Sequence, residues 1–397
     1  MINNSKLSFL HGQIISPSET IQDGFVGISD DGSIESIQRS LPETGLGGPI
    51  TDIKGKTLIP GMIDIHVHGG FGVSFGEGEM ATDLEKYSRF AASHGVTGFL
   101  LSITGPNADT IIRIVKEYVQ IFEQRQIWPG AIPLGFHLEG PFLNPERHGA
   151  FNPVWIHNPN PEEAHAFLDA GRGWVKQISM APELPGVEQT APLLAEAGVV
   201  VSLGHSNTSF EKASAALQGY FTHVTHTFNA QSPLHHREPG VVGAVLASDK
   251  GTAELIGDGI HVHPGAMKIL YRCLGANRIV LVTDAMPGAG LPDGEYELLD
   301  QKVTVRDGKA TLPDGTIGGS TGTMEGCLRN MIQLAGVPMS ESVRMASLNP
   351  AKVIGLDKRL GSIEVGKEAN LAVIDPDFKV HMTIVKGSVV FSRKAGA

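Results

Sequence analysis

Eight short apolar segments alternate with amphipathic helical patterns through the middle of this 397-residue chain. Near-continuous apolar strands are typical of a parallel sheet that is buried on both faces. Parallel neighbours need long crossover connections, which are usually helices. Eight strand–helix units predict an α/β fold, a (β/α)8 TIM-like barrel, rather than an open sheet. The segments are TLIPGMIDIHV, GVTGFLLSIT, AIPLGFHLEG, VKQISMAP, GVVVSLGHS, HVTHTFNA, AELIGDGIHV and NRIVLVTDAM.

The two ends of the chain have a different pattern, in which apolar and polar residues alternate between glycine-containing turns. Such alternation is typical of strands with one buried and one exposed face. Residues 1–57 and 358–397 are therefore predicted to form one small β-sandwich domain built from both termini. Residues 58–357 are predicted to form the barrel. The segment GLPDGEYELLDQKVTVRDGKATLPDG predicts a β-hairpin insertion near residues 290–316.

Composition excludes several classes of protein. Hydrophobic residues make up 41% and charged residues 18%, which indicates an ordered chain. The net charge is −11, and no block of five Lys or Arg residues offers a surface for nucleic acid. No apolar run approaches the roughly 18 residues that a membrane span requires. The start MINNSKLSFLHGQ lacks the pattern of a signal peptide, and the two cysteines form no CxxC motif, so a cytoplasmic protein is expected.

Polar side chains with metal-binding chemistry follow six of the apolar segments. His66 and His68 are two residues apart after the first segment, so on a strand both point to the same face. The carboxyl ends of parallel barrel strands meet at one rim, where barrel enzymes carry their active sites. The sequence therefore predicts one metal site from six residues: His66, His68, Glu139, His205, His226 and Asp284.

Imidazole and carboxylate ligands suit borderline divalent ions such as Zn²⁺ or Fe²⁺. Two ions that share a bridging carboxylate would use all six side chains, although the residues alone do not distinguish one ion from two. A single histidine at a strand end is more often a hydrogen-bonded structural residue. Six such residues at the ends of five segments favour the metal site. His223 and His263 are interpreted as packing or supporting residues.

These residues resemble the amidohydrolase superfamily, in which HxH follows the first strand, His the fifth and sixth, and Asp the eighth. The opening KGKTLIPGMIDIHVHG and the closing SLNPAKVIGL and LGSIEVGKEANLAVID are similar to that superfamily's flanking segments. The match narrows to the N-acetylglucosamine-6-phosphate deacetylases. The motifs that carry it, in order, are HLEGPFLNPERHGA, SLGHSN, THTFNA, HHREPGVVGA, IGDGIHV and LVTDAM.

The resemblance implies a metal-dependent hydrolase that converts N-acetylglucosamine 6-phosphate, a small phosphorylated amino sugar, into glucosamine 6-phosphate and acetate. It implies that Glu139, His205 and His226 hold the main ion. His66 and His68 would hold a second ion, with Glu139 and Asp284 shared, and Asp284 would be the catalytic proton-transfer group. The resemblance also implies eight substrate-binding residues: Ala150, Asn229, Ala230, Arg237, His261, Ile317, Gly318 and Gly319. Arg237 would reach the phosphate in a neighbouring subunit, which implies a homodimer.

One position departs from this family. Phe151 stands where many members carry a substrate-binding histidine, and its ring cannot donate a hydrogen bond to a hydroxyl or phosphate. Main-chain groups near Ala150 could suffice, His148 or Arg147 could substitute, or the preferred substrate could differ.

Three other functions stay open at this level. The chain could deacetylate another N-acetylhexosamine 6-phosphate, or it could be a cyclic-amide or nucleobase hydrolase. Many of the latter use a carboxylated lysine at the end of the fourth strand, whereas Lys176 lies near the start of that segment. A non-catalytic scaffold would typically have lost metal ligands.

Overall fold

The computed structural model describes residues 7–17, 19–40, 50–125 and 127–393. Within them, an eight-stranded parallel sheet follows the order of the chain. Every predicted apolar segment contributes one of its strands. These are β6 (Met62–Asp64), β9 (Val96–Ile103), β10 (Ile132–Glu139), β11 (Val175–Met180), β12 (Val200–Leu203), β13 (Phe221–Val224), β14 (Thr252–Ile256) and β15 (Ile279–Val282).

The first and last strands of this sheet are linked just beyond their carboxyl ends. The Asp284 amide donates to the His66 carbonyl oxygen, and the His68 amide donates to the Ala285 carbonyl oxygen, both at 2.9 Å. The chain segments that carry His66, His68 and Asp284 therefore lie side by side, although more than 200 residues separate them.

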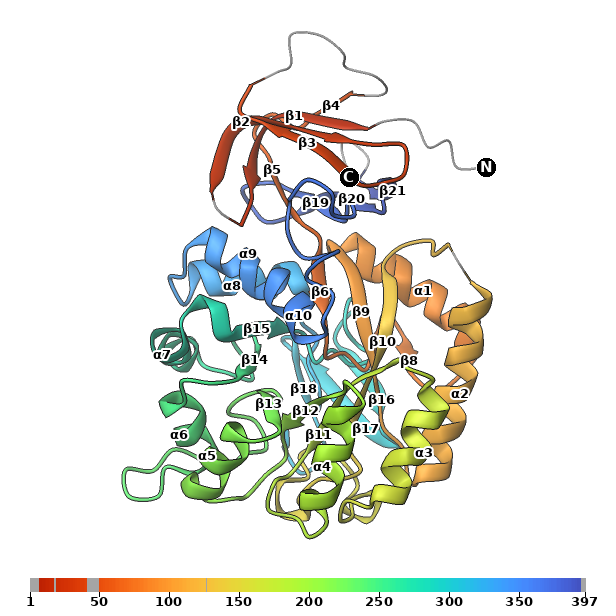
Figure 1. The fold of residues 1–397 in the computed structure, drawn as a ribbon, viewed down its shortest axis with the longest axis vertical. Coiled ribbons are helices and arrows are strands. Elements are labelled where there is room, and N and C mark those ends of the chain that lie inside the picture. The colour runs from red at the N-terminus through yellow and green to blue at the C-terminus, as the bar shows by residue number, and fades with distance from the viewer. Residues whose placement is uncertain (1–6, 18, 41–49, 126, 394–397) are drawn as a thin grey trace.

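Helices surround the sheet (Figure 1). They are α1 (Met80–Ser93), α2 (Ala108–Gln124), α3 (Pro161–Gly171), α4 (Val187–Glu196), α5 (Phe210–Gln218), α6 (Gly240–Ala247), α7 (Pro264–Leu274), α8 (Met324–Gln333), α9 (Met339–Ala346) and α10 (Leu348–Val353). Single 3₁₀ turns cover Pro145–Arg147, Pro153–Trp155 and Ala276–Arg278, and a two-stranded ribbon joins β7 (Gly69–Gly70) to β8 (Val73–Ser74). Among the described residues, none of the helices combines the length and apolar character needed to cross a membrane.

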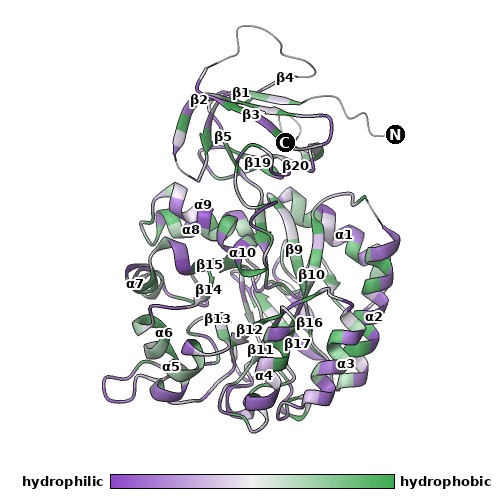
Figure 2. Cartoon of the chain, in the orientation of Figure 1, coloured by the Kyte–Doolittle hydropathy of each residue, from purple (hydrophilic) through white to green (hydrophobic). Residues whose placement is uncertain are grey.

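Helix α2 shows why these segments are helical. Its buried residues, which include Ile111, Val115, Tyr118 and Phe122, recur every three or four positions and form one apolar face. Asn107 caps the helix, because its side chain accepts a hydrogen bond from the Thr110 amide at 2.9 Å. Figure 2 shows the resulting mixture of hydrophobic and hydrophilic positions on the outer helices.

Strands from both ends of the chain form a second sheet, which lies above the helices and the parallel sheet in Figure 1. Its strands are β1 (Ser8–Ile15), β2 (Thr20–Ile28), β3 (Ile34–Gln38), β4 (Ile50–Asp52), β5 (Thr57–Pro60), β19 (Leu371–Ile374), β20 (Val380–Val385) and β21 (Ser388–Ser392). The parts of the predicted end domain at 1–6, 18, 41–49 and 394–397 lie outside the described residues.

The boundary predicted at residue 57 is wrong by several residues. The first apolar segment serves both sheets, since β5 pairs with β1 and β19 in the end sheet and β6 pairs with β9 in the parallel sheet. The chain crosses between the sheets at Gly61, where an added Cβ would lie 2.2 Å from the Thr97 side chain. Both halves are apolar because both sheets bury them, so hydropathy alone did not reveal the break.

The insertion after β15 contains one strand more than the predicted hairpin. β16 (Gly294–Leu298), β17 (Gln301–Arg306) and β18 (Lys309–Thr311) form a three-stranded antiparallel sheet in the described chain. Leu298, Val303, Val305 and Leu312 pack with Met286 into a small core of their own. The insertion is therefore a folded unit attached beside the end of β15.

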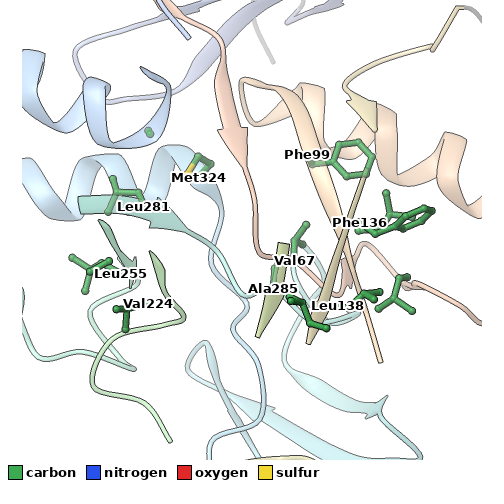
Figure 3. Packing of buried hydrophobic residues seen from close by; sticks show 14 of the residues in the cluster. Val67, Phe99, Phe136, Leu138, Val224, Leu255, Leu281, Ala285 and Met324 are labelled. Carbon is green, nitrogen blue, oxygen red and sulfur yellow. The ribbon is translucent and has the colours of Figure 1, made fainter. Parts of the chain in front are cut away.

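Side chains on the parallel strands alternate between the helix-facing side and the interior. Phe99, Phe136, Leu138, Leu255 and Leu281 belong to the cluster that packs against the helices (Figure 3). The interior positions are apolar towards one end of the strands and polar towards the rim. Leu100, Leu134, Val280 and Val282 pack with Ile354 and Leu360 towards one end.

The next interior layer is polar and leads to the rim. His137 contacts Ser102 Oγ with Nδ1 at 3.0 Å and Ser179 Oγ with Nε2 at 2.8 Å. Ser179 in turn contacts Thr225 at 2.6 Å. Burial lowers the pKa of His137 well below its ordinary value, so this layer is a neutral hydrogen-bonded support.

Truncation of Phe136 to alanine should destabilise the fold. The side chain is fully buried, and its ring lies 5.2 Å from that of Phe122 and 6.2 Å from that of Tyr118. Removing such a ring leaves a cavity and costs about 3–5 kcal/mol. Urea unfolding followed by tryptophan fluorescence measures the change. The control Val154→Ala removes methyl groups from a side chain that is 80% exposed and should shift stability by less than about 0.5 kcal/mol. Equal midpoints for the two variants would contradict the packing described.

Candidate active site

The Glu139 carboxylate, at the carboxyl end of β10, lies at the centre of a cluster of imidazoles. Its Oε1 is 3.0 Å from His226 Nε2, 3.2 Å from His205 Nε2 and 3.4 Å from His66 Nε2. Its Oε2 is 2.9 Å from His68 Nε2. All five residues are at least nine-tenths buried. His205 and His226 therefore face Glu139 together, as a shared metal site requires.

Asp284 completes the set of six predicted residues. Its Oδ1 lies 3.5 Å from both His66 Nε2 and His68 Nε2. The ligand atoms fall into two groups, His66–His68–Glu139 and Glu139–His205–His226, and within each group they lie within 4.8 Å of one another. Glu139 belongs to both groups, so it occupies the bridging position between them.

The residues fit a divalent cation. His66 Nε2 is buried without a hydrogen-bond partner among the described residues, and the Nε2 atoms of His205 and His226 converge to 3.0 Å. Imidazole nitrogens that converge on a carboxylate with no apolar filling between them match the ligand preferences of Zn²⁺ or Fe²⁺. The two groups could hold one ion each.

Electrostatics favour an ionised Glu139. Burial raises the pKa of this carboxyl, but the charge of His66 and hydrogen bonds from His205 and His226 outweigh burial and hold its pKa well below the ordinary value. Burial lowers the pKa of His205, which favours the neutral imidazole that metal binding needs. Asp64, two residues before His66, is fully buried against Thr283, and burial raises its pKa to about 7.

Three of the same residues have a strained backbone. His205, His226 and Asp284 have φ angles of 46°, 26° and 49°. Non-glycine residues rarely adopt positive φ, and such conformations cost on the order of 1–3 kcal/mol and cluster at functional sites. The turns after β12, β13 and β15 therefore hold these three side chains in orientations that the backbone alone would not favour.

A cavity of about 240 Å³ opens onto five of the six residues. It is lined by His68, Glu139, His205, His226 and Asp284 of the metal cluster. The predicted substrate residues that line it are Ala150, Asn229, Ala230, His261, Ile317 and Gly319. Of the described residues, neither Gly318 nor Arg237 is part of this lining, although Gly318 is the direct neighbour of two residues that are.

Arg237 lies in a loop beside the site. Its Nη1 is 2.7 Å from His236 Nε2, and it lines a neighbouring hollow of about 450 Å³ together with Arg147. Within one subunit, the structure does not bring Arg237 to the cavity.

Phe151 forms part of the cavity wall. Its ring packs edge-on to His205, with 5.1 Å between centroids, and belongs to a small apolar cluster with Leu143 and Ile156. Arg147 donates from Nε to Asn207 Oδ1 at 2.8 Å, and His148 Nδ1 is 2.9 Å from the Phe151 carbonyl oxygen. Neither is among the described residues that line the cavity. Two of the three substitutes suggested by the sequence therefore lack support.

His261 and Lys176 each have a defined hydrogen-bond partner. His261 Nδ1 lies 2.7 Å from Asp258 Oδ2, which orients the ring and leaves Nε2 for a ligand. Lys176 donates from Nζ to the Gly173 carbonyl oxygen at 2.8 Å, near the start of β11. It lies near the start of β11, whereas the imidazole and carboxylate cluster lies at the carboxyl ends of the strands, so Lys176 does not take the position of a carboxylated lysine.

Sequence reasoning missed several residues of the site. Leu298, Leu299 and Thr316 line the cavity from the insertion, which has no barrel register to place them. Glu183 ties three loops together, because it accepts hydrogen bonds from Asn144, Ser206 and Asn207. Glu254 lies buried beneath the histidines. The single glutamate inside the apolar segment AELI could have identified Glu254 from the sequence. The turn that carries Glu183 gives no comparable indication.

Comparison with known proteins agrees with this geometry. Residues 57–390 match the amidohydrolase family. N-acetylglucosamine-6-phosphate deacetylase of Bacillus subtilis (strain 168) is 36% identical over 382 residues, which are 96% of each chain. N-acetylgalactosamine-6-phosphate deacetylase of Escherichia coli O157:H7 is 35% identical and covers 86% of this chain and 89% of its own.

A solved structure is also similar along the whole chain. It is a mutant N-acetyl-D-glucosamine-6-phosphate deacetylase from Mycobacterium smegmatis in complex with N-acetyl-D-glucosamine-6-phosphate. The TM-score is 0.90 at 30% identity, with 98% of this chain and 100% of the other covered. The chain belongs to the amidohydrolase family.

Proposed function

We propose that this protein is a divalent-metal-dependent deacetylase that hydrolyses N-acetylglucosamine 6-phosphate to glucosamine 6-phosphate and acetate. The observation that carries the proposal is the Glu139 carboxylate, shared by four imidazoles at the floor of the cavity. Relatives at about 35% identity that bear this activity in their names support the choice of substrate.

Glu139, His205 and His226 would hold the main ion, and His66 and His68 a second one, with Glu139 and Asp284 shared. A divalent ion at such a site supplies a Lewis acid and lowers the pKa of water from 15.7 towards about 7. Zn²⁺ and Fe²⁺ match the donor set equally well.

Asp284 is the group placed to move the proton. It lines the cavity, and its side chain retains a small exposed area, whereas Glu139 is enclosed by imidazoles. Asp284 takes a proton from the attacking water as the water oxygen bonds to the acetamide carbon. It then delivers that proton to the nitrogen as the carbon–nitrogen bond breaks, which releases acetate and the free amine.

His261 is placed to act on the carbonyl oxygen. Asp258 accepts from Nδ1 and fixes the ring, so His261 would donate from Nε2 to the developing negative charge as an imidazolium, with both nitrogens protonated. Loss of one such donor typically costs about 2.7–4 kcal/mol of transition-state stabilisation. The sugar would lie against Ala150, Asn229, Ala230 and residues 317–319.

The phosphate is assigned to Arg237 of a neighbouring subunit in a homodimer. The side chain stands in an exposed loop outside its own cavity, which is consistent with a function across an interface. A guanidinium binds phosphate through two parallel, charge-assisted hydrogen bonds.

The same proposal includes the domain organisation. The two backbone bonds between the exits of β6 and β15 support a closed (β/α)8 barrel. The end sheet, extended to include β5, would form the small β-sandwich domain, and the three-stranded unit would be an insertion in the barrel.

Acetate release from a panel of N-acetylhexosamine 6-phosphates, with and without a chelator, tests the function directly. The glucosamine derivative should be the best substrate, and removal of the metal should abolish turnover because no side chain here can replace a Lewis acid. Preference for the galactosamine derivative would reassign the substrate. Full activity in the chelated protein would exclude the mechanism.

Asp284→Asn should lower kcat by about 100- to 10,000-fold, because the amide cannot take up and deliver a proton. The ion held by Glu139, His205 and His226 should remain, as measured by elemental analysis of the purified variant. A rate near that of the wild type would show that Asp284 is only a ligand.

Arg237→Ala should raise KM for the phosphorylated sugar by about 10- to 100-fold, which corresponds to the loss of a hydrogen bond to a charged group. Hydrolysis of unphosphorylated N-acetylglucosamine should change little. Equal effects on both sugars would identify Arg237 as a solvated or structural residue. Mixing Arg237→Ala with Asp284→Asn subunits provides a control, since a shared site restores activity in the mixed dimer.

A further inference from the structure

Glu254 is a carboxylate with no access to solvent in the interior of the parallel sheet. It lies on β14, and its side chain is fully buried. Burial of an ionised carboxylate costs several kcal/mol unless partners compensate for the lost water. Nothing in the proposed chemistry requires a charge at this depth, so its partners indicate what it does.

The two carboxylate oxygens of Glu254 have separate partners. Oε2 accepts hydrogen bonds from His66 Nδ1 at 2.8 Å and from the His226 backbone amide at 3.0 Å. Oε1 accepts from Gln177 Nε2 at 2.7 Å and contacts His223 Nε2 at 3.1 Å. One oxygen therefore faces the metal cluster, and the other is anchored in the polar layer below it.

The bond to His66 determines which nitrogen is free for a metal. Because a carboxylate acceptor holds one proton on Nδ1, a metal ion that displaces the Nε2 proton would meet a lone pair directed towards Glu139 and Asp284. A carboxylate behind a metal-bound histidine fixes the ring and raises its basicity, and loss of such partners typically costs about 10- to 100-fold in metal affinity.

In the Glu139–His205–His226 group, the hydrogen-bond partner behind His205 is weaker than a carboxylate. His205 Nδ1 is held by the Arg147 backbone carbonyl oxygen at 2.7 Å, which carries no net charge. The Glu254 anion bonds directly to an imidazole of the His66–His68 group, whereas in the other group it reaches only the His226 backbone amide. It favours a second cation where Glu139 and Asp284 are already shared.

We propose that Glu254 is the positioning residue for the His66–His68 group and sets the affinity of the second metal ion. The inference rests on the two-ion form of the proposed function, but not on the identity of the sugar. Glu254 acts through His66 and touches neither the substrate nor the reacting atoms.

Zinc titration of purified, metal-free Glu254→Gln in competition with a chromophoric chelator tests the proposal. The wild type should bind two ions per subunit. In Glu254→Gln the weaker ion should lose about 10- to 100-fold in affinity, while the ion held by Glu139, His205 and His226 should change less than about threefold.

Gln177→Met is the matched control. It removes a buried donor to the other carboxylate oxygen and leaves the bond to His66 intact. Both ions should bind this variant as they bind the wild type. An equal loss in both variants would assign the effect to the polar layer as a whole, and unchanged binding in Glu254→Gln would overturn the proposal.

A zinc-loaded crystal structure of the wild type gives a second test that requires no variant. Coordination through His66 Nε2, with Nδ1 still bonded to Glu254, is expected. Coordination through Nδ1, or a single bound ion, would contradict the proposal. Wild-type protein that binds no metal would instead refute the proposed function itself.

Discussion

Burial of the Glu139 carboxylate among imidazoles is the interaction on which the rest of the site depends. A carboxylate removed from water is costly unless charge and hydrogen bonds replace the solvent. Four Nε2 atoms lie within 3.4 Å of it, yet a neutral imidazole supplies only one proton, and His66 and His205 already use Nδ1 elsewhere. A divalent cation resolves this arrangement because it turns the converging lone pairs into favourable contacts.

A hydrogen-bonded polar layer beneath the rim supports this centre. The strands contribute polar groups such as His137 and Ser179 in the layer beneath the rim, where barrels usually pack branched apolar side chains. His137 and Ser179 are both hydrogen-bonded to other side chains of this layer. The strained turns at His205, His226 and Asp284 rest on this support.

Much of the metal half of the site could be predicted from the sequence, because strand geometry determines it. Parallel strands end at one rim, so the sequence places His66, His68 and Glu139 together, although both histidines lie just beyond the end of β6 and not on the strand as expected. The break at Gly61 was not predictable in this way, since hydropathy does not distinguish one buried sheet from another. Leu299 was missed because it lies outside any strand register and has a positive φ of 52°.

The substrate-facing wall of the cavity is built from different elements than the metal-binding cluster. Its wall comes from loops and from the insertion, where Phe151 and Leu299 pack against each other on the side of the cavity next to His205. The Phe151 ring thereby supports His205 by edge-on packing, and it offers no polar group to the cavity. Changes in these loops can alter which sugar binds while the strand ends keep the same chemistry. The metal-binding cluster and the loop-built wall of the cavity are therefore structurally separable, and Phe151 lies on the boundary between them.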